Sequence, residues 1–536
     1  MNLFGEQVWI GLTRHRDLSA SRPPAPPLAE LASSWGATLV FFALAVASLM
    51  DSACGGVTHT NTSSAVSLIE NGRKKSSGGL ICGLLDDGVA HIPENYTTFA
   101  PPALGGSYRD TLTGCMVTRV ATTDAVHGYS LSEPFNSNST YMFVRSNQGG
   151  HLRIIDLTGS VIVPSSKMPT MNGSTFQPLW AVSDPNSFYY GSGGLLKKGT
   201  ISGLPTCGQS HTCTITSTTV RDFAGIYNGI GVGIGDYDLS EDGDHIAFVA
   251  QEAFDTQLII SVWELSTAKE INKYVTKTSD CVERNVTHDT QPACLHRLQI
   301  DPLNRPIMDW CCKWPETGRS YWNGSTLTQF LDTNSSTHSD VGKDINGNAI
   351  LVQVHNAMPN GTGQNDACNG HGGISWLQLD TLTDHCLYAI DYSADHISYR
   401  GGPSQPYVLF DSAGGCPGAG YFNNSPSFHA PTTAIPLFQG QCPVEGDVRP
   451  EFSIIALVRI DTVGSTIGAL GTPKAVLVAQ HRSRTNGKYW TQPRSSISRD
   501  GRYVAFDSNM AYVNGLGCGL KNPQDCIDVY VVKVQN

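Results

Sequence analysis

A sequence motif that predicts a strand, a turn and a second strand recurs along this chain, and this repeat restricts the folds that the chain can adopt. The clearest copy lies near the C-terminus, where the pair Asp500-Gly501 precedes an apolar run at 503–506. Gly tolerates a positive φ without steric cost and Asp can bond its own backbone, so this pair predicts a tight turn between two strands. A further apolar run at 528–534 predicts a third strand of the same sheet.

The same phrase recurs upstream. Two copies are clear and begin at Ser240 and Asp344, whereas weaker copies begin at Asn136, Ser183, Asp301 and Gly402. The copies recur at intervals of roughly 40 residues or more, and each has room for three or four strands. A repeat of this kind is the signature of a β-propeller, so the sequence predicts an all-β, seven-bladed β-propeller.

Composition supports a turn-rich protein and excludes one class of partner. The 536 residues include 55 Gly and 29 Pro, and only 15% of them are charged. Such a composition is typical of a sheet protein with many turns and a neutral polar surface. The formal net charge of −11 argues against nucleic acid as a partner, because phosphate binding requires a basic face.

The N-terminal segment predicts export. Arginines precede an apolar stretch at 35–50, which is short for a membrane-spanning helix and suited to a secretory leader. Cys54 offers a second interpretation, a lipid anchor, and no later stretch is long and apolar enough to span a membrane. The expected location is therefore secreted, periplasmic or at the cell surface. We expect a leader at 1–54, a low-complexity linker or cap at 55–105 and the propeller at 106–536.

Fifteen cysteines favour an oxidising compartment. Apart from Cys54 their number is even and most lie in predicted loops, which indicates disulfides rather than buried thiols. Cys311 and Cys312 are adjacent, and they pair either with each other or with other cysteines. Candidate pairs close in sequence, whose connectivity spacing alone does not fix, are Cys82/Cys115, Cys207/Cys213, Cys281/Cys294, Cys368/Cys386, Cys416/Cys442 and Cys518/Cys526.

The last copy of the repeat lacks a fourth strand, because the chain ends directly after the third. A strand-like segment at 115–121 precedes the first copy, and we expect it to supply the missing strand. Closing the ring in this way removes two unpaired sheet edges.

The phrase Asp-Gly-x-x-Ile/Val-Ala-Phe, followed by a strand that ends in Asp-Leu or Val-Lys-Val, resembles the blade repeat of TolB-like (PD40, WD40-like) propellers. The resemblance covers 115–536 and is strongest at 240–265 and 497–534. It implies the propeller fold and a closing strand from the N-terminal side. The copies that begin at Ser183, Asp301 and Gly402 depart from the pattern, since Pro-containing segments replace Asp-Gly there. A fold resemblance implies little about function.

Aligning the repeats on their second strands places polar residues at the start of several innermost strands. His338, His396 and Gln492 share one aligned position, Tyr129 lies nearby in the first copy, and His296 lies one position later in the fourth. An offset of one residue turns a strand side chain to the opposite face unless a bulge intervenes. Because innermost strands line a propeller channel, we expect these side chains to converge on one mouth.

Imidazoles in a ring are good ligands for Mn, Zn or Fe, and an amide oxygen can join them. The sequence therefore predicts a divalent metal, with Ca as a further candidate, held by His296, His338, His396 and Gln492. An imidazole without a metal can instead act as a general base.

The cluster also resembles that of propeller lyases that act on uronic-acid polysaccharides, such as oligogalacturonate lyases. Elimination on a uronate must neutralise a carboxylate and remove the adjacent proton. His338, His396 and Tyr129 are candidates for the proton transfer. Arg400 and Arg494, on the same strands as predicted mouth residues, are candidate partners for the carboxylate.

Two function classes remain open at the level of sequence. The first is a secreted propeller that binds an extracellular glycan or protein at the channel mouth. The second is a metal-assisted polysaccharide lyase, or another enzyme on an acidic glycan, that uses the same residues. The sequence favours the first class, because a resemblance of fold does not supply a site.

An acidic stretch at 236–244 invites comparison with a calcium-binding loop. An EF-hand requires a Glu at its twelfth position, and counting from Asp238 that position holds Val249. The stretch is therefore interpreted as a turn within a blade.

Overall fold

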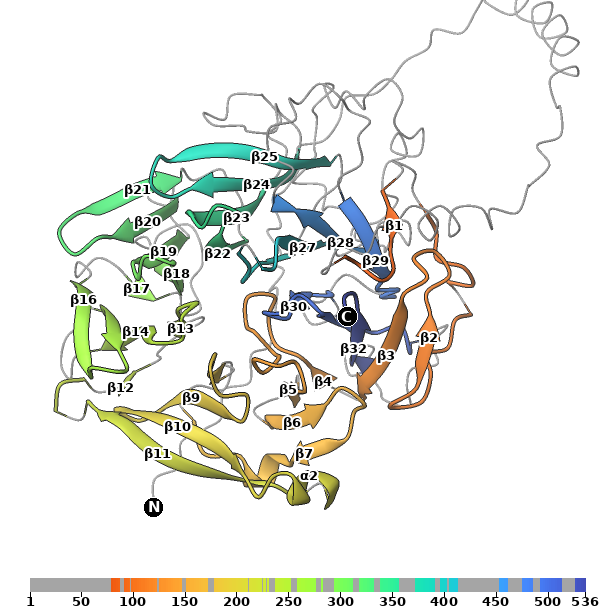
Figure 1. Ribbon diagram of the computed structural model, residues 1–536, viewed down its shortest axis with the longest axis horizontal. Helices are drawn as coiled ribbons and strands as arrows, with labels where there is room; N and C mark the ends of the chain where they lie inside the picture. The colour runs from red at the N-terminus through yellow and green to blue at the C-terminus, as the bar shows by residue number, and fades with distance from the viewer. Residues whose placement is uncertain are drawn as a thin grey trace, which may run out of the picture. The chain divides into compact units, whose positions relative to one another are not determined.

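The computed structural model has the predicted architecture, with seven sheets arranged around a central axis (Figure 1). The predicted leader at 1–54 lies outside the residues that the structure describes. Those residues are 79–86, 91–96, 98–122, 125–146, 151–171, 178–210, 212–223, 225–227, 229–230, 237–251, 258–275, 281–282, 294–311, 318–331, 338–355, 372–390, 396–402, 404–412, 453–460, 475–484, 492–512 and 526–536.

Each sheet forms one blade, and the blades follow one another in chain order. Blade 1 contains β4 (Ala125–Val126), β5 (Tyr141–Ser146), β6 (Arg153–Asp156) and β7 (Val161–Val163). Blade 2 contains β8 (Leu179–Trp180), β9 (Ser187–Ser192), β10 (Leu195–Ser202) and β11 (Thr214–Asp222). Blade 3 contains β12 (Gly229–Ile230), β13 (Tyr237–Leu239), β14 (His245–Gln251), β15 (Leu258–Glu264) and β16 (Lys269–Val275). Blade 4 contains β17 (Cys281–Val282), β18 (Cys294–Ile300), β19 (Pro306–Cys311), β20 (Gly318–Trp322) and β21 (Leu327–Leu331).

The remaining three blades complete the ring. Blade 5 contains β22 (Ser339–Lys343), β23 (Ala349–His355), β24 (Gly372–Gln378) and β25 (Thr383–Ile390). Blade 6 contains β26 (His396–Ser398), β27 (Tyr407–Asp411), β28 (Ile454–Arg459), β29 (Ala475–Gln480) and, outermost, β1 (Leu84–Leu85). Blade 7 contains β30 (Ser496–Ile497), β31 (Tyr503–Ser508), β32 (Asp528–Lys533), β3 (Met116–Ala121) and β2 (Ser107–Arg109).

The ring closes as the sequence predicts. β3, from the N-terminal side, pairs antiparallel with β32, the last strand of the chain, and Val117 lies opposite Val532. The disulfide Cys82–Cys115 ties the segment before β1 to the residue before β3. The last blade therefore has no missing strand, and the first and last parts of the described chain share one sheet.

The second strands of the blades have a run of buried apolar residues at their centres because neighbouring blades cover both of their faces. In β14, Ile246 and Phe248 pack into one core cluster, whereas Ala247 and Val249 pack into another. Successive side chains of a strand point to opposite faces, so the two clusters lie on the two sides of the blade. Burying a side chain such as that of Phe248 stabilises the fold by about 2–3 kcal/mol.

Two of the predicted disulfides are present, Cys82–Cys115 and Cys207–Cys213. Cys386 and Cys526 are also disulfide-bonded. Every other predicted pair includes a cysteine whose side chain lies outside the described part of the chain.

Helical structure in the described residues consists of α2 (Thr206–Ser210) and the short 3-10 turn η1 (Ser165–Lys167). Within this part of the chain, no helix has the length and apolar character needed to cross a membrane.

Candidate functional site at the channel mouth

The structure brings together three of the residues that the sequence predicts at one mouth. The His338 and His396 rings lie 4.7 Å apart between centroids, and the Tyr129 ring lies 5.8 Å from His338 and 5.7 Å from His396. His338 directly precedes β22 and His396 begins β26, so both stand at the amino ends of innermost strands. We call this end of the propeller axis the channel mouth. Tyr129 and His338 are partly exposed there, and His396 is buried.

His396 is held in one orientation by Asp411, its cross-strand partner in blade 6. The His396 Nδ1 lies 3.1 Å from the Asp411 Oδ1, and the Asp411 Oδ2 accepts the backbone N–H of Ser495 at 2.6 Å. Burial alone would raise the pKa of Asp411, but the contacts with His396 and Ser495 lower it below its ordinary value. With Nδ1 held on the Asp411 carboxylate, Nε2 is the ring nitrogen of His396 that does not contact Asp411.

Tyr129 reaches the mouth on a loop that interrupts the innermost strand of blade 1. β4 ends at Val126, and regular pairing resumes only at the bridge between Phe135 and Met142. We call residues 127–133 the central loop. The Ser496 hydroxyl, from β30 of blade 7, lies 3.2 Å from the Tyr129 carbonyl oxygen and anchors the loop to the neighbouring blade. The glycine at 128 has a φ of +117°, a conformation that a bulkier residue rarely adopts.

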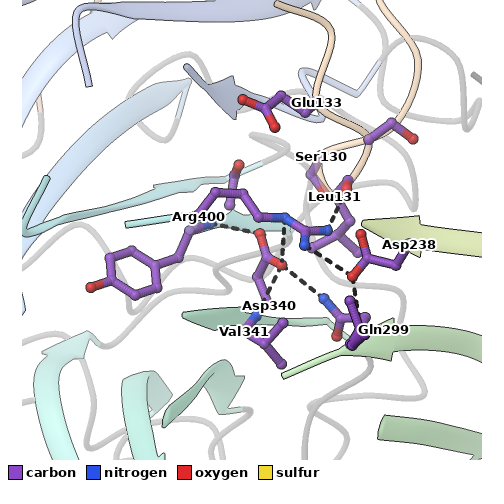
Figure 2. Close-up of polar contacts among 12 residues, drawn as sticks. Ser130, Leu131, Glu133, Asp238, Gln299, Asp340, Val341 and Arg400 are labelled. Atoms are coloured by element: carbon purple, nitrogen blue, oxygen red, sulfur yellow. Dashed lines mark hydrogen bonds and ion pairs between the residues drawn. The ribbon is translucent and has the colours of Figure 1, made fainter. Parts of the chain in front are cut away.

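Arg400 lies two residues beyond β26, deeper along the axis than His396, and joins four blades. Its Nη1 is 2.9 Å from the Asp238 Oδ2, and its Nε is 3.4 Å from the Asp340 Oδ1. Its Nη2 donates to the carbonyl oxygen of Leu131, in the central loop, and Gln299 donates to Asp340 at 2.7 Å (Figure 2). Burial alone would lower the pKa of Arg400, but the two carboxylates raise it above its ordinary range.

Arg494 also lies in an internal ion pair. Its guanidinium contacts the Asp507 carboxylate, and both side chains are fully buried. The same Asp507 contacts His127 Nδ1 at 2.7 Å, and the Arg494 carbonyl oxygen lies 2.9 Å from His127 Nε2. The carboxylate role predicted for Arg400 and Arg494 stays a prediction, and both guanidinium groups already contact carboxylates of the chain itself.

Ser496, His127 and Asp507 follow one another at hydrogen-bond distances, as in a serine hydrolase triad. The Ser496 Oγ is 3.3 Å from the His127 Nε2, and all three side chains are fully buried. A catalytic serine must reach substrate. In this protein the Ser496 hydroxyl instead lies among carbonyl oxygens of the central loop, so the arrangement anchors that loop.

β18 of blade 4 contains a bulge at the position of His296. The register of β18 against β19 shifts between Leu295 and Arg297, so the bulge that would correct the offset of His296 is present. The side chain of His296 lies outside the described part of the chain. Gln492 is described and partly exposed, and the predicted metal set of His296, His338, His396 and Gln492 stays a prediction.

Arg297 is the site residue that sequence reasoning missed. Its side chain is only 8% exposed, and burial lowers its pKa, although the Asp340 carboxylate and Tyr129 act in the opposite direction. Among the described residues, its Nη2 has no hydrogen-bond acceptor and no carboxylate lies within 4.0 Å of its guanidinium. Within the described part of the chain this buried guanidinium has no ion pair, and it interacts electrostatically with Tyr129, so it is a group that an anionic ligand would satisfy.

Comparisons with known proteins give matches among solved structures alone. No protein-family model and no curated protein matches the chain. Among solved structures, it is similar to an oligogalacturonate lyase in complex with manganese, with 12% identity, a TM-score of 0.47, and 80% of this chain and 96% of that chain covered. The oligogalacturonate lyase of Vibrio parahaemolyticus gives 12% identity, a TM-score of 0.46, and coverages of 80% and 96%.

The chain is also similar to TolB from Acinetobacter baumannii, with 13% identity, a TM-score of 0.29, and 65% of this chain and 62% of that chain covered. Proteins of both kinds named from the sequence are therefore among the solved structures to which this chain is similar. The strand pairing of this chain identifies it as a seven-bladed β-propeller closed by an N-terminal strand.

Proposed function

We propose that this protein binds an extracellular acidic glycan at the channel mouth. The observation that carries the proposal is the gathering of the Tyr129, His338 and His396 rings, whose centroids lie within 5.8 Å of one another. The guanidinium of Arg297 has no ion pair among the described residues and interacts electrostatically with Tyr129. Aromatic faces pack against sugar rings, and imidazole nitrogens exchange hydrogen bonds with hydroxyl groups. A guanidinium is suited to a carboxylate.

The fold supports a preformed site, in which the side chains are held in place before a ligand binds. Tyr129 is held by the central loop and His396 by Asp411, so neither ring needs to be ordered when a ligand arrives. The disulfides Cys82–Cys115 and Cys207–Cys213 support an extracellular or periplasmic location, because such bonds persist in oxidising compartments.

A glycan array with matched acidic and neutral oligosaccharides tests this proposal. We expect retention of carboxylated glycans by the purified protein, and loss of at least tenfold in affinity for Tyr129→Ala and His338→Ala. The matched control is His385→Ala, which removes an imidazole from the outermost strand of the blade that carries His338 and should bind as the unaltered protein does. Binding to no glycan, or equal binding by all variants, would contradict the proposal and favour a protein ligand or another surface.

One observation favours a second function, elimination on the same acidic glycan. The Asp411–His396 pair has the geometry of an oriented general base, and Tyr129 stands beside it. In this reaction His396 Nε2 would take the proton next to the carboxylate, the glycosidic C–O bond would break, a C=C bond would form, and the Tyr129 hydroxyl would protonate the leaving oxygen. Ultraviolet absorbance of an unsaturated product, absent in His396→Ala, tests it.

A further inference from the structure

A second cluster of metal-ligating side chains lies away from the channel mouth, in blade 3. Ligand atoms of Asp244, His245 and Glu264 all lie within 4.8 Å of one another. His245 begins β14, and Glu264, its cross-strand partner, ends β15. The acidic turn at 236–244 therefore lies beside the Glu264 carboxylate of the next hairpin. A search for a local loop motif does not find this contact, because Glu264 is distant in sequence.

The surroundings of His245 are rich in metal-ligand atoms. The His245 Nδ1 lies 3.3 Å from the Asp242 carboxylate, and its Nε2 lies 3.6 Å from the Glu264 Oε1. The Asn304 amide, from the turn between β18 and β19 of blade 4, approaches the same Nε2 to 3.4 Å. That amide can present either its nitrogen or its oxygen. Potential ligands thus converge from two blades on one imidazole.

Among the described residues, this cluster contains more carboxylates than basic groups. Three carboxylates, those of Asp242, Asp244 and Glu264, surround one imidazole that is only 8% exposed. Among the described residues, no Lys or Arg lies within 4.0 Å of any of the three. Carboxylates held this close to one another repel, and a cation between them would relieve that repulsion, which solvent screens in part because the Asp242 side chain is 57% exposed.

We propose that Asp244, His245 and Glu264 form a divalent-metal site that fastens the β13–β14 turn to the end of β15. One imidazole with carboxylates suits Zn²⁺ or Mn²⁺, and the imidazole disfavours Ca²⁺ and Mg²⁺, which select oxygen ligands. In a tetrahedral site the ligand atoms stand about 3.4 Å apart, given metal–ligand distances of about 2.1 Å. Small rotamer changes would bring atoms now within 4.8 Å to that spacing.

Zinc content and thermal stability of chelator-treated protein test this site. After dialysis against Zn²⁺ and removal of loosely bound ions, we expect Glu264→Gln and Asp244→Asn each to hold one zinc fewer per chain than the unaltered protein. The rise in Tm that zinc produces should fall by at least half in both variants. The Glu264 side chain is 27% exposed, so its amide variant is expected to fold.

The His338→Ala variant separates this site from the channel mouth. It should keep the zinc of blade 3 and its effect on Tm, whatever its effect on glycan binding. Equal zinc content in Glu264→Gln and the unaltered protein, or no bound zinc in either, would overturn the site. Loss of zinc in His338→Ala alone would assign the metal to the mouth, which would also overturn this inference while leaving the proposed function intact.

Discussion

The carboxylate of Asp507 in blade 7 accepts the backbone N–H of His127 in blade 1 at 3.0 Å, across 380 residues of sequence. The same kind of contact joins other consecutive blades, in which an Asp side chain of one blade accepts a backbone N–H of the innermost strand or its continuation in the next. These contacts are Asp238 with Ile300, Asp340 with Tyr399, and Asp411 with Ser495. Side-chain carboxylates therefore link neighbouring blades where no sheet hydrogen bonds run between them.

Asp507→Asn should lower the free energy of unfolding, because it disrupts the contacts of Asp507 with Arg494 and with His127 of blade 1. The change leaves the guanidinium of Arg494 buried without its carboxylate, so we expect a loss of about 3–5 kcal/mol in the free energy of unfolding. Asp380→Asn is the matched control, because Asp380 is 51% exposed in its contact with Arg305 and should cost less than about 1 kcal/mol. Chemical denaturation measures both. Equal stability of the two variants would show that the Asp507 contacts contribute little.

The disulfide Cys82–Cys115 should stabilise the fold more than Cys207–Cys213. The first closes a loop with a sequence separation of 33 and the second one of 6, and a longer closed loop restricts the unfolded chain more. Loop-closure entropy gives about 4 kcal/mol for the first and about 2 kcal/mol for the second. The double variants Cys82→Ser/Cys115→Ser and Cys207→Ser/Cys213→Ser, compared by thermal unfolding, check the order. A larger loss in the second pair would contradict it.

Because the ring of His481 is buried in its neutral form, we expect the free energy of unfolding to fall in acid. Its Nε2 donates to the Ser412 carbonyl oxygen and its Nδ1 accepts from the Ser483 N–H, which requires a neutral ring. Burial lowers its pKa from the ordinary value of 6.5 to about 4. Between these values the unfolded chain takes up a proton that the folded chain does not, so the stabilisation is complete above pH 6.5 and declines as the pH falls towards 4.

The variant His481→Gln isolates this contribution. Its free energy of unfolding should lose about 2 to 3 kcal/mol less than that of the unaltered protein when the pH is lowered from 7 to 4.5. Urea unfolding at the two pH values decides the matter, and parallel curves for His481→Gln and the unaltered protein would count against the assignment.

The repeated motif predicts most of the fold. The Asp500-Gly501 pair predicts the turn between β30 and β31, where Gly501 has a φ of +70°. The alternation of apolar runs and turns marks all seven blades, because each second strand is buried on both faces whatever the rest of the blade does. The closing strand follows from the same argument, since the last copy lacks one partner.

The site was only partly predictable, for local reasons. Equal spacing in the repeat brought His338 and His396 together, because both lie on regular innermost strands. In β18 the bulge between Leu295 and Arg297 breaks that spacing, and the one-residue offset of His296 among the aligned repeats is the sequence signal that accompanies it. The aligned repeats point to His296, and nothing in the repeat pattern points to Arg297.

Removal of Arg400 should lower the free energy of unfolding strongly, whereas removal of Arg297 should change it little. Arg400→Met leaves the buried carboxylates of Asp238 and Asp340 without their shared guanidinium, so we expect a loss of about 3–5 kcal/mol. Arg297→Met removes a buried charge that has no ion pair, so the free energy of unfolding should change by less than about 1 kcal/mol or rise. Denaturation of the two variants side by side measures the contrast, and a large loss for Arg297→Met would mean that its charge is paired.

The affinity of Arg297→Met for an acidic glycan, measured by titration calorimetry, tests the proposed binding site most directly. The variant is expected to fold as the unaltered protein does and to bind the carboxylated glycan at least tenfold more weakly, as loss of a charge-assisted hydrogen bond predicts. A glycan whose carboxyl groups have been reduced to alcohols should bind both proteins with equal affinity. Unchanged affinity of Arg297→Met for the carboxylated glycan would contradict the account of the channel mouth as the site that receives the acidic group.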